Sequence, residues 1–185
     1  MQDHLLNIIE QDEVEDVIDL NEKFLAMALG GIEIEELTAL TKIELRVDTL
    51  CHNLQVTGEI LPSLEFLKLN DSVIRCFRDL GTSFKNVRVL HLARCEIREV
   101  QGIQAFKQLE ELYISFNELE DLFDISFLEH LTILDLEGNN IHSLDQICYL
   151  KPLSKLTDVN FKQNPVKTTD SDAYKNLIKM NCPNL

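Results

Sequence analysis

The chain has 185 residues, of which 45% are apolar and 26% charged, and 32 Asp and Glu against 17 Lys and Arg give a formal net charge of −15. The apolar content excludes a disordered chain, and the acidic surplus disfavours sequence-general binding to nucleic-acid phosphates. No apolar run approaches the roughly 20 residues that a membrane-spanning helix needs, and the N-terminus lacks the basic start of a signal peptide. We therefore expect a soluble intracellular protein with neither a nucleic-acid nor a membrane partner.

Residues 1–36 carry eleven acidic side chains against one Lys. Apolar residues such as Val14 and Val17 nevertheless recur at helical spacing. Asn21 is a suitable N-cap for a further helix, which Gly30 would end. The residues that follow, 37–166, form a repeat array, and the ends of such an array expose its core unless something covers them. We therefore interpret residues 1–36 as an acidic, helical N-terminal cap or arm.

Residues 37–166 repeat one frame six times. Its clearest copy is Leu-x-x-Leu-x-Leu-x-x-Asn-x-Ile from Leu131 to Ile141, which is the frame of leucine-rich repeats. Copies begin 22 to 25 residues apart, and all 24 apolar positions, four in each of six copies, hold apolar residues. The copies begin at Leu40, Leu64, Val87, Leu109, Leu131 and Leu156.

The central Leu-x-Leu of each copy predicts a short strand with both Leu side chains on one face. Stacked copies would join these strands into one parallel sheet over a continuous core. The second half of each copy has a three-residue apolar period, as at Ile97, Val100 and Ile103, which favours 3₁₀ turns. We predict an α/β leucine-rich-repeat solenoid with short parallel strands on the concave face, turns and 3₁₀ segments on the convex face, and helical caps.

The ninth frame position turns the chain away from the sheet, where backbone groups lose their ladder partners. An amide such as that of Asn139 can bind those groups from inside the coil. Asp48, Ser72 and Cys95 stand there in earlier copies and are poorer partners. We therefore expect looser N-terminal repeats.

Residues 167–185 predict a C-terminal cap helix, with Tyr174, Leu177 and Ile178 on its apolar face. Pro183 and the residues after it resemble the beginning of another strand. We expect the chain to continue beyond this point as part of a longer protein.

No arrangement of residues indicates catalysis. The sequence has no phosphate-binding glycine loop and no combination typical of a nucleophile with its base. Five cysteines stand far apart without a Cys-x-x-Cys pair, which disfavours zinc sites and disulfide frameworks. We expect no enzyme activity, no cofactor and no metal. The cysteines are Cys51, Cys76, Cys95, Cys148 and Cys182.

The concave face offers a candidate protein-binding site. Residues on either side of each inward Leu must point outward, and several of them are aromatic or apolar. A solvated sheet face is the alternative interpretation, but interface cores favour such anchors. His91 beside Tyr113 is either a pH sensor or a plain surface histidine. The predicted site residues are Phe66, Lys68, Val89, His91, Glu111, Tyr113, Ile133, Asp135 and Glu137.

Charge is segregated along the array. Residues 73–98 hold six Lys and Arg against two acids, whereas residues 110–137 hold nine acids and no Lys or Arg. Such an asymmetry can orient a charged partner during encounter.

Several stretches outside the frame resemble a family. Arg78 to Ser83 reads Arg-Asp-Leu-Gly-Thr-Ser, Leu92 to Cys95 reads Leu-Ala-Arg-Cys, and Leu134 to Asn139 reads Leu-Asp-Leu-Glu-Gly-Asn. Together they resemble the ciliary leucine-rich-repeat proteins required for outer dynein arm assembly, over about residues 35–166. The coil length also resembles the class of the protein phosphatase-1 regulator and of axonemal dynein light chains.

The resemblance implies a non-enzymatic factor for assembly, maturation or ciliary transport of outer-arm axonemal dynein. Its partners would be outer-arm dynein subunits and the intraflagellar transport machinery, in the cytoplasm and the motile cilium or flagellum. One alternative is a permanent structural subunit of the axoneme, associated with dynein or doublet microtubules. A phosphatase regulator is the weaker alternative, suggested by coil class alone.

Overall fold

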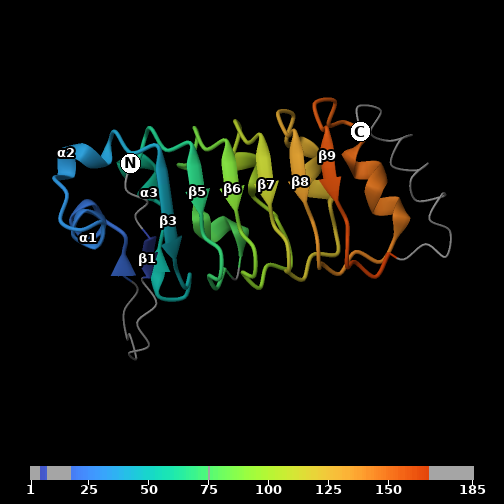
Figure 1. Ribbon diagram of the computed structural model, residues 1–185, viewed down its shortest axis with the longest axis horizontal. Coiled ribbons are helices and arrows are strands. Elements are labelled where there is room, and N and C mark those ends of the chain that lie inside the picture. Colours follow the sequence, from blue (N-terminus) through green and yellow to red (C-terminus); the bar gives the residue numbers. More distant parts are fainter. Residues whose placement is uncertain (1–4, 8–17, 75, 167–185) are drawn as a thin grey trace.

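The computed structural model describes residues 5–7, 18–74 and 76–166. Its main element is a parallel sheet of seven strands in the order β1-β3-β5-β6-β7-β8-β9 (Figure 1). A second sheet pairs β2 (Ile18–Asp19) with β4 (His52–Asn53), also in parallel. The seven strands are β1 (Leu5–Asn7), β3 (Lys42–Arg46), β5 (Phe66–Lys68), β6 (Val89–His91), β7 (Glu111–Tyr113), β8 (Ile133–Asp135) and β9 (Asp158–Asn160).

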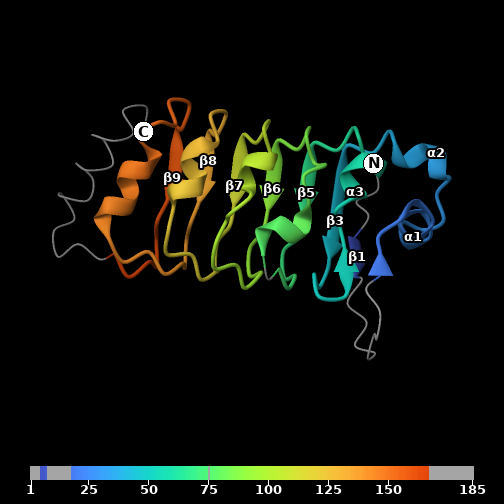
Figure 2. The same cartoon turned by 180° about the vertical axis from the view of Figure 1, so that it is seen from behind.

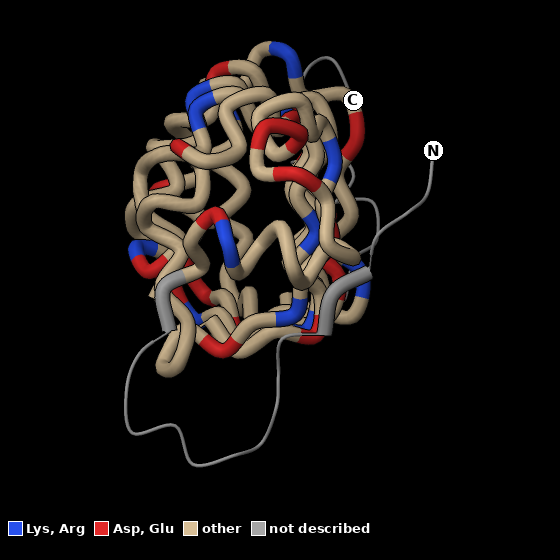
Figure 3. Tube along the Cα trace, turned by 90° about the vertical axis from the view of Figure 1, so that its left-hand side faces the viewer, with Lys and Arg blue, Asp and Glu red and all other residues tan. Residues whose placement is uncertain are grey.

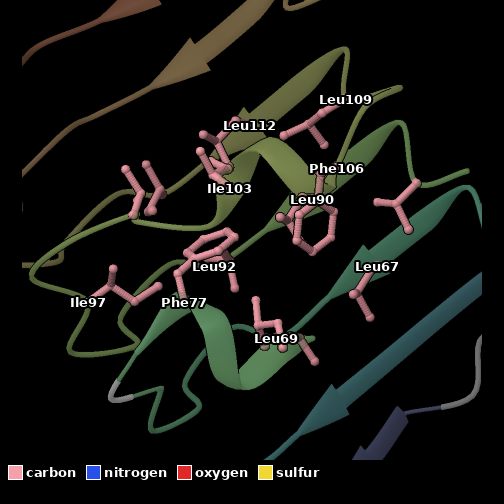
Figure 4. Close-up of a cluster of buried hydrophobic side chains, with 14 of the residues drawn as sticks. Leu67, Leu69, Phe77, Leu90, Leu92, Ile97, Ile103, Phe106, Leu109 and Leu112 are labelled. Atoms are coloured by element: carbon pink, nitrogen blue, oxygen red, sulfur yellow. The ribbon is translucent and has the colours of Figure 1, made fainter. Parts of the chain in front are cut away.

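Six of these strands lie on the central Leu-x-Leu of the six frame copies. Leu67, Leu90, Leu112 and Leu134 are fully buried at the middle of their strands, while the residue on either side is half-buried. Inward side chains of neighbouring coils therefore meet in one core, as the close-up in Figure 4 shows. The predicted parallel leucine-rich-repeat architecture is confirmed.

The return half of each coil lies behind the sheet, on what we call the convex face (Figure 2). Most of its helical segments are 3₁₀, as the three-residue apolar period predicts, although none of the 3₁₀ segments begins at the first residue of its periodic run. Ile97 and Val100 stand in irregular backbone before such a segment. The segments are α3 (Thr57–Ile60), η1 (Phe77–Leu80), η2 (Ile103–Ala105), η3 (Phe123–Phe127) and η4 (Leu144–Leu150).

The chain leaves each strand from β5 to β9 through the same left-handed backbone position, four residues after the first residue of the inward pair. Its φ values run from 56° to 68° across five successive coils. Only Gly138 predicts this conformation from the sequence, because glycine adopts positive φ readily and the other four residues carry side chains. The five positions are Asp71, Arg94, Phe116, Gly138 and Gln163.

Buried amides join consecutive coils just beyond this turn. Asn117 Oδ1 accepts from the N–H groups of Cys95 and Ile97, at 2.9 and 3.1 Å. Asn139 Oδ1 accepts from Leu119 N at 3.1 Å, and its Nδ2 donates to carbonyls of its own coil and of the preceding one. Ser72 Oγ, by contrast, accepts one backbone N–H, from Val47, at 3.0 Å.

Replacing Asn139 with Ala should lower the free energy of unfolding by about 1–3 kcal/mol, because several buried backbone groups lose their partner. Ser72→Ala should cost less, since the hydroxyl serves one such group. Denaturant titration of both variants measures the difference. Equal, near-zero losses would mean that water replaces the side chain at both turns.

The first coil departs from the frame. Leu50 occupies the last apolar frame position of this copy, yet it is 54% exposed and does not join the core. Asp48 Oδ1 accepts from Leu50 N at 2.9 Å and closes a tight turn that directs Leu50 outward. The chain then enters β4, and Leu54 takes the core position with no exposed surface.

The N-terminal end is covered by α1 (Glu22–Ala28) and α2 (Ile34–Leu37), at the left of Figure 1. Asn21 Oδ1 accepts from Phe24 N at 3.0 Å, which confirms the predicted N-cap. Leu25 is fully buried in the same core as the repeats.

The helical interpretation of residues 1–36 is incomplete. β1 continues the sheet beside β3, although the sequence carries no frame copy there. Ile18 begins β2 rather than continuing a helix. Val14 and Val17 lie outside the described residues, as does the cap helix predicted over 167–185. No helix of the described residues is long and apolar enough to cross a bilayer.

Replacing Leu25 with Ala should destabilise the protein by about 2–5 kcal/mol, the usual loss for a fully buried Leu. Met27→Ala is the matched control on the same helix, because Met27 is 69% exposed and should have little effect. Thermal melting separates the two variants. If both melt like the wild-type chain, α1 is an appendage and does not cap the core.

Candidate protein-interaction site on the concave face

The outward residues of the sheet form two straight rows. Parallel pairing places Phe66, Val89, Glu111 and Ile133 opposite one another on β5 to β8. The same register aligns a second row two residues further along each strand. Neighbouring strands are about 4.8 Å apart, so each row is one contiguous strip. The second row consists of Lys68, His91, Tyr113 and Asp135.

Three rings stack across β5, β6 and β7. The centroids of His91 and Tyr113 are 4.3 Å apart with an interplanar angle of 12°, and those of Phe66 and His91 are 5.1 Å apart with a tilt of 41°. Lys42 Nζ lies 4.9 Å from the centroid of the Phe66 ring, where the ring quadrupole attracts a cation. We call Phe66, His91 and Tyr113 the concave aromatic stack. Its rings hold one another in place.

Charges on the N-terminal side of this stack neutralise one another. Lys68 Nζ and Glu44 Oε1 are 2.7 Å apart. Asp71 binds Arg94 through two hydrogen bonds, at 2.5 and 3.0 Å, and lies 3.7 Å from Arg46. Seen end-on from the N-terminal side, the coils carry both basic and acidic residues around their circumference (Figure 3).

Charges on the C-terminal side are not neutralised in this way. Asn160 Nδ2 donates to Asp135 Oδ1 at 2.8 Å and to Glu137 Oε2 at 3.0 Å. Glu111 accepts from Tyr113 Oη at 2.8 Å. Within the described part of the chain, no Lys or Arg pairs with any of these three carboxylates. From its N-terminal to its C-terminal strands, the concave face therefore carries salt-bridged charges, then aromatic rings, then carboxylates that form no salt bridge in the described structure.

The stacked rings are uncharged near neutral pH. Burial, the hydrogen bond to Glu111 and the charge of Glu111 raise the pKa of Tyr113 to about 12. Burial, followed by the charge of Lys68, lowers the pKa of His91 below its usual value, although Glu111 and Glu44 oppose the shift. A neutral imidazole between two other rings behaves as part of an apolar surface.

All nine predicted residues lie together on this face, and each is half-buried rather than freely exposed. The sequence indicated which side chains point outward, because strand alternation decides that. It did not indicate that neighbouring rings cover one another. Lys42 and Glu44 belong to the same surface and were left out of the predicted set, although their places in β3 mark them as outward. Among the described residues, no group of three or more His, Cys, Asp or Glu side chains is placed to hold a metal.

His91 should titrate with a pKa below 6.5, the value of an ordinary histidine. Because the folded state then binds fewer protons than the unfolded state, His91 should favour folding above pH 6.5 and lose that contribution as the pH falls. NMR titration of the imidazole measures this pKa. Tyr113→Ala should raise it by exposing the ring to water. An unchanged pKa in that variant would contradict burial by the stack as the cause.

No protein-family model matches the chain. The chain is 42% identical to leucine-rich repeat-containing protein 56 of Rattus norvegicus over 134 residues, which are 72% of this chain and 24% of the rat protein. It is 27% identical over 108 residues to cilia- and flagella-associated protein 410 of Mus musculus, which covers 58% of this chain and 43% of that protein. The chain belongs to the family of leucine-rich repeat-containing protein 56. It spans about a quarter of the length of the rat relative.

A crystal structure of internalin C2 from Listeria monocytogenes superimposes with a TM-score of 0.64 at 20% identity, over 92% of this chain and 65% of the internalin chain. The fold is that of a leucine-rich-repeat solenoid. At this identity the similarity concerns the fold alone.

Proposed function

We propose that this protein is a non-enzymatic protein-interaction scaffold that binds its partner on the concave face. The concave aromatic stack carries the proposal: Phe66, His91 and Tyr113 lie in contact on adjacent strands, on the side away from the core. Tyr is enriched among the residues that contribute most to binding at protein interfaces, and Phe is enriched in interface cores. The repeat frame constrains the inward Leu residues and leaves these positions free, so the fold does not require rings there.

The shape and charge of the face favour a protein over a small ligand. The outward rows are contiguous across four strands, and the second row ends in Asp135, with Glu137 two residues further along the same coil. No Lys or Arg of the described residues pairs with either carboxylate. An extended surface of rings beside open negative charge suits a partner with apolar side chains next to Lys or Arg. Tyr113 is central and has both a ring and a hydroxyl, which makes it the best anchor.

The cellular role that we propose is ciliary. The similar mouse protein is named as cilia- and flagella-associated. The chain resembles, over about residues 35–166, the ciliary leucine-rich-repeat proteins required for outer dynein arm assembly. We propose assembly, maturation or transport of outer-arm axonemal dynein, with outer-arm subunits and the intraflagellar transport machinery as partners, in the cytoplasm and the motile cilium.

A permanent structural subunit of the axoneme is the second candidate, because the same face would serve it equally well. Detergent extraction of isolated cilia distinguishes the two roles. A transient factor should leave with the soluble fraction while the dynein arms remain on the axoneme. A structural subunit should stay with the extracted axoneme.

Replacing Tyr113 with Ala and Asp135 with Lys in one chain should abolish capture of outer-arm dynein subunits. The double change removes the central ring and reverses a charge, and loss of one interface anchor often costs about 2 kcal/mol or more. Circular dichroism and melting should report an intact fold, since neither side chain belongs to the core.

Arg98→Glu is the matched control away from the concave face, because Arg98 pairs with Glu118 on the exposed surface. It should leave capture nearly unchanged. Wild-type capture by the double variant, or loss of capture in the control alone, would mean that the binding face lies elsewhere.

A further inference from the structure

Three aromatic side chains also meet on the convex face. Phe123 and Phe127 lie on η3 and Tyr149 on η4 of the next coil. The Phe123 centroid lies 5.3 Å from that of Phe127 and 5.5 Å from that of Tyr149, and both pairs pack edge to face. The three residues are 48%, 51% and 37% exposed, respectively. We call them the convex aromatic cluster.

The fold does not require these rings. The three-residue period of η3 directs Leu122, Ile125 and Leu128 into the core, and Phe123 and Phe127 fall outside that period. The residue that follows the corresponding apolar position is Gln101 in the preceding coil and Asp145 in the following one. The fold therefore accepts a polar residue at the position that Phe123 occupies. Large exposed rings packed against one another form an apolar surface of the kind found at interaction sites.

The charge around the cluster is mainly negative, with Lys107 and Lys151 just outside the acidic stretch. From Gln108 to Leu150 the chain holds ten Asp and Glu and no Lys or Arg. Asp121 lies at the cluster itself, because its Oδ1 accepts from Phe123 N at 2.8 Å. Asp124 follows Phe123 and accepts from Gln104 Nε2 at 2.6 Å. Neither carboxylate pairs with a cation among the described residues.

A surface hollow of about 360 Å³ adjoins the cluster. Its apolar lining comes from Phe106, Phe127 and Leu128, and Glu129 and Lys107 add one charge of each sign. The remaining lining residues are polar, namely Gln104, Gln108 and His130. A hollow of this size beside exposed rings can receive an apolar side chain from a partner, with a carboxylate at its rim for a cationic group.

We propose that the convex aromatic cluster is a second docking surface, for a basic amphipathic helix of a partner protein. The rings and the hollow match an apolar stripe along such a helix, and Asp121, Asp124 and Glu129 match Lys or Arg on either side of the stripe. This surface faces away from the concave aromatic stack, so the two sites can be occupied together. The inference does not depend on what the concave face binds.

The experiment uses the full 185-residue chain and a fluorescent peptide of about 18 residues, or about five helical turns, made of Leu and Lys with the Leu residues in one helical stripe. Fluorescence anisotropy should report saturable binding. A peptide of the same composition with its stripe scrambled, and one with Glu in place of Lys, should bind much more weakly. Equal binding of the scrambled peptide would reduce the effect to general charge attraction and overturn the proposal.

The variant Phe123→Ala with Phe127→Ala should weaken binding of the striped peptide roughly tenfold or more. Tyr149→Ala is a milder second variant, in case the double variant melts early. Gln101→Ala, at the matching position one coil earlier, and Tyr113→Ala, on the concave face, should bind like the wild-type chain.

Wild-type binding by both cluster variants would overturn the proposal. So would loss of binding in Tyr113→Ala alone, which would assign the peptide to the concave face. If sedimentation shows a dimer that Phe123→Ala with Phe127→Ala converts to a monomer, and the peptide does not bind, the cluster is an interface between two copies of this chain and the proposal fails. Failure of dynein-subunit capture, by contrast, would leave this second surface untouched.

Discussion

Every coil of this solenoid depends on its neighbours to bury its apolar side chains. A three-residue strand such as β6 offers one fully inward Leu, and that side chain is buried in a core to which the neighbouring coils contribute. Backbone hydrogen bonds follow the same rule, because the sheet ladder and the Asn117 and Asn139 amides all connect one coil to the next. The shared core also determines which residues are left for binding, because successive side chains of a strand point to opposite faces of the sheet.

Inter-coil register explains why the concave face is a surface rather than a set of separate side chains. His91 lies directly beside Tyr113 because β6 and β7 pair in parallel without an offset. The same register carries acidic residues alongside the rings and leaves them without cationic partners in the described structure. On the convex face, by contrast, Phe123 and Tyr149 meet across coils of unequal path, where no strand register aligns them. The two aromatic groups therefore have different structural origins.

Local rules made much of the architecture predictable. The Leu-x-Leu strands, the Asn21 cap and the outward positions of Phe66 and Tyr113 follow from side-chain alternation and capping chemistry, which involve only nearby residues. The exposure of Leu50 was not predictable, because it depends on the turn that Asp48 closes and on the pairing of β4 with β2, a strand more than 30 residues earlier. The left-handed turns at Asp71 and Arg94 gave no signal, since neither residue is a glycine.

Contacts between coils also were not predictable from the frame. Stacking of Phe66 on His91 depends on side-chain rotamers, and the meeting of Phe123 with Tyr149 depends on how two return segments of different length pass one another. The frame describes each coil and says little about the surface that several coils make together. Identifying a candidate site on such a protein therefore requires its structure, even where the fold can be predicted from the sequence.

The transfer of hydrogen bonds from each coil to its neighbour has a consequence for how the molecule opens. In a one-dimensional stack, a terminal coil has one neighbour and an interior coil has two, so opening begins at the ends and advances inward coil by coil. The concave aromatic stack spans β5 to β7, in the interior of the seven-stranded order. It can stay assembled while the outermost coils fray, so the molecule can present an intact central face to a partner while its ends exchange between open and closed states.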